Sequence, residues 1–183
     1  MPNPVEELMD DHRVIERVLE ALEKRVVAAE GGEIPAGFVE EALEFFAEFA
    51  DNHHHFKEES ALFPTLERRG VPKEGGPIGM MLHEHELGRA ALRGIRENLP
   101  KAKEGSPEAV EAVRRHADEY INVLRNHIWK EDNVLFRMAV MHLSDEDMKQ
   151  LEAEFHNPDN PRVQPDRREK YESFARNLAR PAE

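Results

Sequence analysis

Apolar residues recur at helical spacing in four long stretches of the chain. The stretches cover about residues 5–30, 38–69, 77–98 and 107–141. Glycine-rich or proline-containing segments separate them and are typical of short connections between helices. Long amphipathic helices joined by short loops predict an all-α fold, an antiparallel up-down-up-down four-helix bundle built from two helical hairpins.

Two prolines and the C-terminal region modify this pattern. We expect Pro64 to kink the second helix or distort one turn, and Pro100 to mark the end of the third. Residues 1–143 are predicted to form the bundle. Residues 144–183 are predicted to form an extension of short helices that packs on it, although an oligomer contact is an alternative role. The sequence does not predict the oligomeric state.

The two halves of the chain are similar at one fixed offset, the shift that carries His54 onto His127. Such an internal repeat indicates that each half is one copy of the same helix pair. In each copy, one histidine on the first helix is followed by a His-x-x-x-Glu motif on the second. The matching segments are Asp11-His12 with Glu84-His85, and His54-x-x-x-Glu58 with His127-x-x-x-Glu131.

The His-x-x-x-Glu spacing places an imidazole and a carboxylate on one face of a helix. Together with the two earlier histidines, the repeat supplies four histidines and two glutamates. That set is too large for one zinc ion, but it fits two metals that are bridged by the carboxylates and keep free positions. Without a metal, these groups would be buried unpaired at a cost of several kcal/mol. The predicted metal ligands are His12, His54, Glu58, His85, His127 and Glu131.

The repeat also separates His54 from its two neighbours. Under the same shift, His53 falls on Asn126 and His55 falls on Ile128. Because each residue of an α-helix turns by about 100°, we expect His53 and His55 to face away from the metals, as solvated or supporting imidazoles.

Three further polar residues are weaker candidates for the site. By the same helical geometry, His83 should lie on roughly the opposite side of its helix from His85, exposed or in a supporting position. His116 and Tyr120 share a helix face with His127 and are interpreted as hydrogen-bonded groups of the core. Alternatively, one of them reaches a metal-bound species, and Tyr120 is therefore kept as a candidate catalytic residue.

Composition narrows the choice of partners. With 25 basic and 38 acidic residues the net charge is −13, which argues against binding nucleic acid or anionic lipid. The absence of cysteine excludes disulfides, thiolate nucleophiles and cysteine-ligated clusters. Neither a signal-peptide pattern nor a long apolar run occurs, so we expect a cytoplasmic protein without a membrane span.

One competing all-α class is excluded by spacing. Ferritin-like di-iron bundles carry a Glu-x-x-His motif, with a glutamate three residues before a metal histidine. None of the ten histidines has one, and the corresponding positions before His54, His85 and His127 are Asp51, Leu82 and Leu124.

The motif set resembles the hemerythrin-like cation-binding family, also called the HHE domain, over about residues 5–141. The Glu58-Glu59-x-x-Leu62-Phe63-Pro64 continuation and the Glu84-His85 pair are also similar to that family. The resemblance implies a non-haem centre of two iron ions, oxo- or hydroxo-bridged, that meets O2, NO or peroxide. Carried over by position, His12, His54, His85 and His127 are terminal ligands, and Glu58 and Glu131 bridge.

The chain departs from the oxygen-carrying members in two ways. Those proteins have a fifth histidine, four residues from the third-helix one, where this chain has Met81 or Arg89. They also use a carboxylate five residues after the last histidine. Asp132 has that spacing here, but the repeat favours Glu131.

The four-His, two-Glu pattern resembles members linked to nitrosative-stress repair and peroxide chemistry. We therefore expect a protein that reacts with a small oxidant. The alternative is a non-enzymatic O2 or NO binder or sensor, or an iron buffer.

Overall fold

The fold is all-α, as the sequence predicted. The computed structural model describes residues 3–162 and 165–178, and within them no strand occurs. Helix formation follows the local signals: Asn3 caps the first helix by accepting hydrogen bonds from the backbone N–H groups of Val5 and Glu6. Ser106 caps another, with Pro107 in its first turn.

Four continuous helical runs make up most of the molecule. The first joins α1 (Pro4–Leu22) to the π-helical segment η1 (Glu23–Val27). The second consists of α2 (Ala36–Phe45), η2 (Phe46–His55), η3 (Glu58–Leu62) and α3 (Phe63–Arg68). The third is α4 (Pro77–Lys103), and the fourth consists of α5 (Pro107–Lys130), η4 (Glu131–Leu135) and α6 (Phe136–His142).

Both prolines lie inside helices. The third helix does not end near Pro100 but continues to Lys103, so the predicted end was wrong. A proline in the last turn removes only one hydrogen bond, and the rest of the turn can still form. Pro64 follows directly on η3, and the chain remains helical to Arg68, in agreement with a locally distorted turn.

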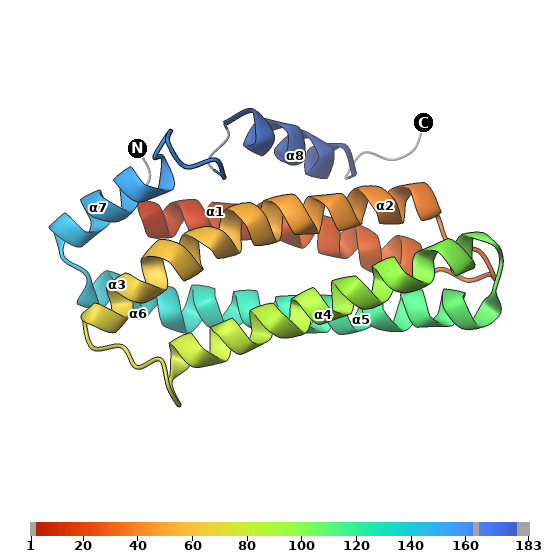
Figure 1. Cartoon of the computed structure of the whole chain (residues 1–183), viewed down its shortest axis with the longest axis horizontal. Helices are drawn as coiled ribbons and strands as arrows, with labels where there is room; N and C mark the ends of the chain where they lie inside the picture. The colour runs from red at the N-terminus through yellow and green to blue at the C-terminus, as the bar shows by residue number, and fades with distance from the viewer. Residues whose placement is uncertain (1–2, 163–164, 179–183) are drawn as a thin grey trace.

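The runs contact one another along their lengths (Figure 1). The most extensive contact is the hairpin formed by α4 and α5. Helix α1 contacts α2, η2 and α5, and α2 contacts α4. The early histidine of each half therefore comes from α1 or α4, and the His-x-x-x-Glu motif comes from the run that follows.

The apolar interior is divided into two clusters by a band of buried polar residues. On α1, Leu8 belongs to one cluster and Ile15 to the other, with the buried His12 between them. On α5 and η4, His127 lies in the same way between Leu124 and Leu135. Burying polar groups costs free energy unless they are paired, so the residues of this band require partners that stabilise them.

The C-terminal extension contributes to both clusters. Helix α7 (Asp145–Phe155) buries Leu151 and Phe155 in the cluster at the α3 end. Helix α8 (Pro165–Leu178) buries Tyr171 and Ala175 against the other cluster. Both helices contact α1, and Figure 1 shows them along one side of the molecule. The division into domains at residue 143 stays a prediction.

Candidate metal centre

The structure brings all six predicted ligands together. Each is almost completely buried, and their nitrogen and oxygen atoms form two groups in which all atoms lie within 4.8 Å of one another. Glu58 belongs to both groups, as expected for a bridging carboxylate. That these side chains bind metal stays a prediction. The groups are His12, His54, Glu58 and Glu131, and His55, Glu58, His85 and His127.

His55 corrects the sequence prediction, because it faces the site and is not directed away from it. Its side chain is buried, and its ring stacks on that of His85 with 3.8 Å between centroids. His55 ends the π-helical segment η2, in which a turn contains more residues than in an α-helix. Consecutive side chains are then separated by a smaller angle, so His54 and His55 both point inward.

Many buried polar atoms at the centre of the site have no hydrogen-bond partner in the described part of the chain. They are Nε2 of His12 and of His55, both ring nitrogens of His54, and both carboxylate oxygens of Glu58 and Glu131. Buried polar atoms are almost always satisfied, and an unpaired group costs about 1–3 kcal/mol. Lone pairs that converge from imidazoles and carboxylates are the donor set of a divalent metal. The residues therefore fit a pair of cations.

A carboxylate lies next to Nδ1 of every histidine in the site. Where the two groups form a hydrogen bond, the carboxylate fixes the orientation of the ring and leaves Nε2 as the metal donor. This holds for His12, His55, His85 and His127, whereas Nδ1 of His54 lies near Asp11 without a hydrogen bond. The pairs are His12 with Asp132 at 2.7 Å, His54 with Asp11 at 3.5 Å, His55 with Asp51 at 3.4 Å, His85 with Glu59 at 2.7 Å, and His127 with Glu84 at 3.2 Å. The preference for Glu131 over Asp132 agrees with this placement, because Asp132 contacts a histidine and lies outside both groups.

Each of these carboxylates also forms an ion pair with a basic side chain. Arg89 binds both Asp51, at 2.7 Å, and Glu59, at 2.8 Å. The remaining pairs are Arg13 with Asp132, Lys57 with Asp11 and Lys130 with Glu84. We did not predict this outer layer from the sequence. The signal was present, because the shift that relates the two halves also carries Asp11, Lys57 and Glu59 onto Glu84, Lys130 and Asp132.

The carboxylates change the proton affinity of the histidines. Burial lowers the pKa of His12, but the carboxylates of Asp132 and Glu131 more than reverse this and raise it to about 9. Burial likewise lowers the pKa of His127, whereas Glu131 and Glu84 raise it to about 10. Without metal, both imidazoles are thus protonated at neutral pH, and a metal must displace those protons.

The metal-free protein is expected to become less stable as pH rises from 7 to 10. Histidines whose folded pKa exceeds the unfolded value of about 6.5 stabilise the fold below pH 6.5, and this contribution is lost as pH rises through about 9 and 10. Urea unfolding of chelator-treated protein at pH 7 and pH 10 measures the change. Burial and the neighbouring Lys57 lower the pKa of the buried His53 to about 3. Its contribution to the pH dependence of stability therefore lies below about pH 6.5, outside the range from pH 7 to pH 10.

The metal-loaded protein serves as the control, because metal replaces the two protons and should remove the alkaline loss. A free energy of unfolding that rises between pH 7 and pH 10 in the metal-free protein would contradict the linkage.

The other candidate residues do not belong to either group of potential ligands. Tyr120 is buried in the apolar core, where its ring packs on Phe46 with centroids 4.7 Å apart, and a catalytic role for it stays a prediction. His116 is partly exposed and lies 2.8 Å from Glu119. His83 is exposed. His53 lies beside Lys57, with 2.8 Å between Nε2 and Nζ.

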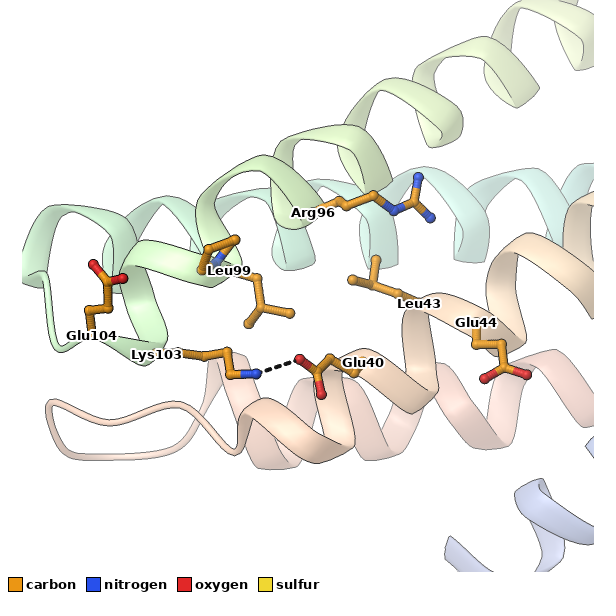
Figure 2. A pocket seen from close by; sticks show the side chains of 8 residues that line it. Glu40, Leu43, Glu44, Arg96, Leu99, Lys103 and Glu104 are labelled. Atoms are coloured by element: carbon orange, nitrogen blue, oxygen red, sulfur yellow. Dashed lines mark hydrogen bonds and ion pairs between the residues drawn. The ribbon is translucent and has the colours of Figure 1, made fainter.

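A surface groove of about 670 Å³ between α2 and α4 is unrelated to this site. Figure 2 shows Leu43 and Leu99 in its floor and an ion pair between Lys103 and Glu40, at 2.7 Å, across it. None of its lining residues belongs to either group of potential ligands. Among the residues described, no helix combines the length and apolar character needed to cross a membrane.

Comparison with known proteins indicates a cation-binding domain, in agreement with the buried groups of potential ligands. Residues 3–139 match the family described as the hemerythrin HHE cation binding domain. Two proteins named iron-sulfur cluster repair protein YtfE are each 30% identical to this chain. The one from Escherichia coli O157:H7 matches over 128 residues, which cover 68% of this chain and 57% of that protein. The one from Salmonella typhimurium matches over 136 residues, which cover 72% of this chain and 60% of that protein. The chain thus spans less than two thirds of these relatives. With its buried histidine and glutamate clusters, the chain belongs to the hemerythrin HHE cation-binding domain family.

Proposed function

We propose that this protein holds two iron ions at the buried site and reacts there with a small oxidant, peroxide, NO or O2. The observation that carries the proposal is the set of unpaired imidazole nitrogens and carboxylate oxygens that converge between the two apolar clusters. A donor set that mixes imidazoles with carboxylates suits iron, and it exceeds the four ligands that structural zinc takes. When bound, the pair of irons supplies reversible one-electron oxidation and open positions for a small ligand.

The residues around the site prepare it for this role. Asp132, Glu59 and Glu84 accept the Nδ1 protons of three histidines, which orients these rings so that Nε2 is the nitrogen left for a metal. Phe136 stacks on His12, and Phe63 lies parallel to His85, so apolar walls limit access of water. A dry, enclosed site admits small neutral molecules more readily than large or charged ones.

The proposal includes the architecture. The four helical runs are taken as an antiparallel up-down-up-down bundle of two duplicated hairpins. The support is that ligands and outer carboxylates of one half recur in the other under the single shift from His54 to His127. Such a duplication explains how two nearly equivalent metal positions arise from one ancestral helix pair.

The relatives favour iron chemistry over simple storage of O2. Their name, iron-sulfur cluster repair protein, refers to clusters that contain iron, and the family match over residues 3–139 includes all six predicted ligands. Because the chain covers only 57–60% of those proteins, cluster repair itself is not assigned to it.

Two measurements test the function. Protein produced with ample iron should contain two irons per chain and show a near-UV charge-transfer band, and a stoichiometry far from two would end the proposal. Stopped-flow mixing of the reduced protein with peroxide, NO or O2 then separates the outcomes. Turnover of the oxidant supports a reaction, whereas a stable reversible adduct supports binding or sensing. A lack of response to all three contradicts the function.

A further inference from the structure

The buried imidazole of His55 has a free nitrogen directed at the metal site. Its Nε2 has no hydrogen-bond partner among the described residues, and one nitrogen of His55 lies within 4.8 Å of ligand atoms of Glu58, His85 and His127. Because Nδ1 faces Asp51 at 3.4 Å, Nε2 is the nitrogen left for a metal. The exposed fraction of His55 is 5%, so water does not substitute for a partner. A histidine that only filled space in the core would be expected to have both ring nitrogens satisfied.

The surroundings of His55 repeat the construction found behind the other four histidines. Its Nδ1 faces a carboxylate, that of Asp51, and Asp51 in turn is held by Arg89. Arg89 also binds Glu59, the partner of His85. One guanidinium thus supports the carboxylates behind two imidazoles, and those imidazoles stack with 20° between their planes. Support of this kind is typical of metal-binding histidines.

We propose that His55 is a fifth imidazole ligand and that it makes the two metal positions unequal. One position takes Nε2 of His55, His85 and His127, and the other takes His12 and His54. This inference rests on the proposed function, because it requires two metals in the site. The asymmetry is particular to one half of the chain: in the other half, the position that corresponds to His55 is Ile128, which is buried and apolar.

The two metal positions have unequal numbers of potential donors. Glu58 belongs to both groups, and Oε2 of Glu131 lies 3.2 Å from Nε2 of both His12 and His127. If both carboxylates are shared, the position with His55 has one donor more than the other position. The metal held by His12 and His54 would therefore have one protein donor fewer.

The His55→Phe variant tests the ligand, because phenylalanine keeps the stacking on His85 but lacks the nitrogen. The wild-type protein loaded with ⁵⁷Fe should give two Mössbauer doublets of equal area. In the variant, one doublet should shift while the other stays, and affinity for one iron should fall by at least ~10-fold. The matched control is His83→Phe, which removes an exposed imidazole outside both groups and should leave spectrum and affinity unchanged. A His55→Phe protein with wild-type spectrum and affinity overturns the proposal.

A second measurement needs no variant and is independent of whether the variant folds. Cobalt(II)-loaded wild-type protein should show five hyperfine-shifted, exchangeable imidazole N–H resonances in its proton NMR spectrum, one for each ligand histidine. Four such resonances in a protein that holds two metals would refute only the role of His55. A wild-type chain that binds fewer than two metals would instead refute the proposed function.

Discussion

The Glu58→Ala variant is expected to lose both metals. Its carboxylate is the one donor that belongs to both groups of ligands, it is fully buried, and neither oxygen has a hydrogen-bond partner among the described residues. Removing it takes a ligand from each metal at once and leaves two cations facing one another with less charge between them. Metal analysis after gel filtration should give close to two irons per chain for the wild type and well below one for the variant.

The matched control is Glu67→Ala, which removes an exposed carboxylate from the same helical run and should retain both metals. A Glu58→Ala protein that still binds two metals with wild-type affinity would show that Glu58 is not the shared ligand. The near-UV spectrum gives a second readout, because the charge-transfer band should disappear together with the metals.

The Lys57→Met variant is expected to lose about 3–5 kcal/mol of stability, the cost of breaking a buried ion pair from one side. Lys57 is 4% exposed, and its Nζ lies 2.7 Å from Glu7 and 3.2 Å from Asp11, both buried. Methionine keeps the volume and the apolar stem but leaves these carboxylates without their ammonium partner. Arg168 also contacts both and should hold the loss near the lower value. Urea unfolding of the metal-free protein measures the change.

The control for this prediction is Lys24→Met. Lys24 pairs with Glu20 at 2.6 Å, but both side chains are largely exposed, so the substitution should change the free energy of unfolding very little. An equal effect of the two substitutions would contradict the argument from burial. Because Asp11 lies beside His54, Lys57→Met should in addition weaken metal binding, whereas Lys24→Met should not.

Much of the candidate site could be predicted because the same motif recurs in the sequence at one fixed offset. His54 and His127, each followed four residues later by a glutamate, and His12 and His85 upstream of them, were identified by spacing and offset alone. Spacing on an α-helix determines which side chains share a face, and this needs no knowledge of how the helices pack. The all-α fold followed from the apolar periodicity for the same reason.

His55 could not be predicted in this way, because its position depends on a local departure from α-helical geometry. The sequence pattern assumes about 100° for each residue, whereas η2 widens the turn that contains His54 and His55. Pro100 shows the opposite case, since a strong local signal for a helix end was overridden by the rest of α4, where Leu99 and Ala102 are buried in the core. Local propensities are weak when tertiary packing opposes them.

The sequence by itself determined which residue types are available, their helical spacing, and the fixed offset at which the six predicted ligands recur. The tertiary structure alone decided which histidines face the interior, which carboxylate lies between the two groups, and which basic residues stand behind each acid. The physical reason is the range of the interactions. The spacing of residues along one helix determines how side chains a few residues apart are arranged, whereas the convergence of Nε2 atoms depends on how separate helices pack. Asp51, Arg89 and His55, brought together from η2 and α4, become part of the site only through that packing.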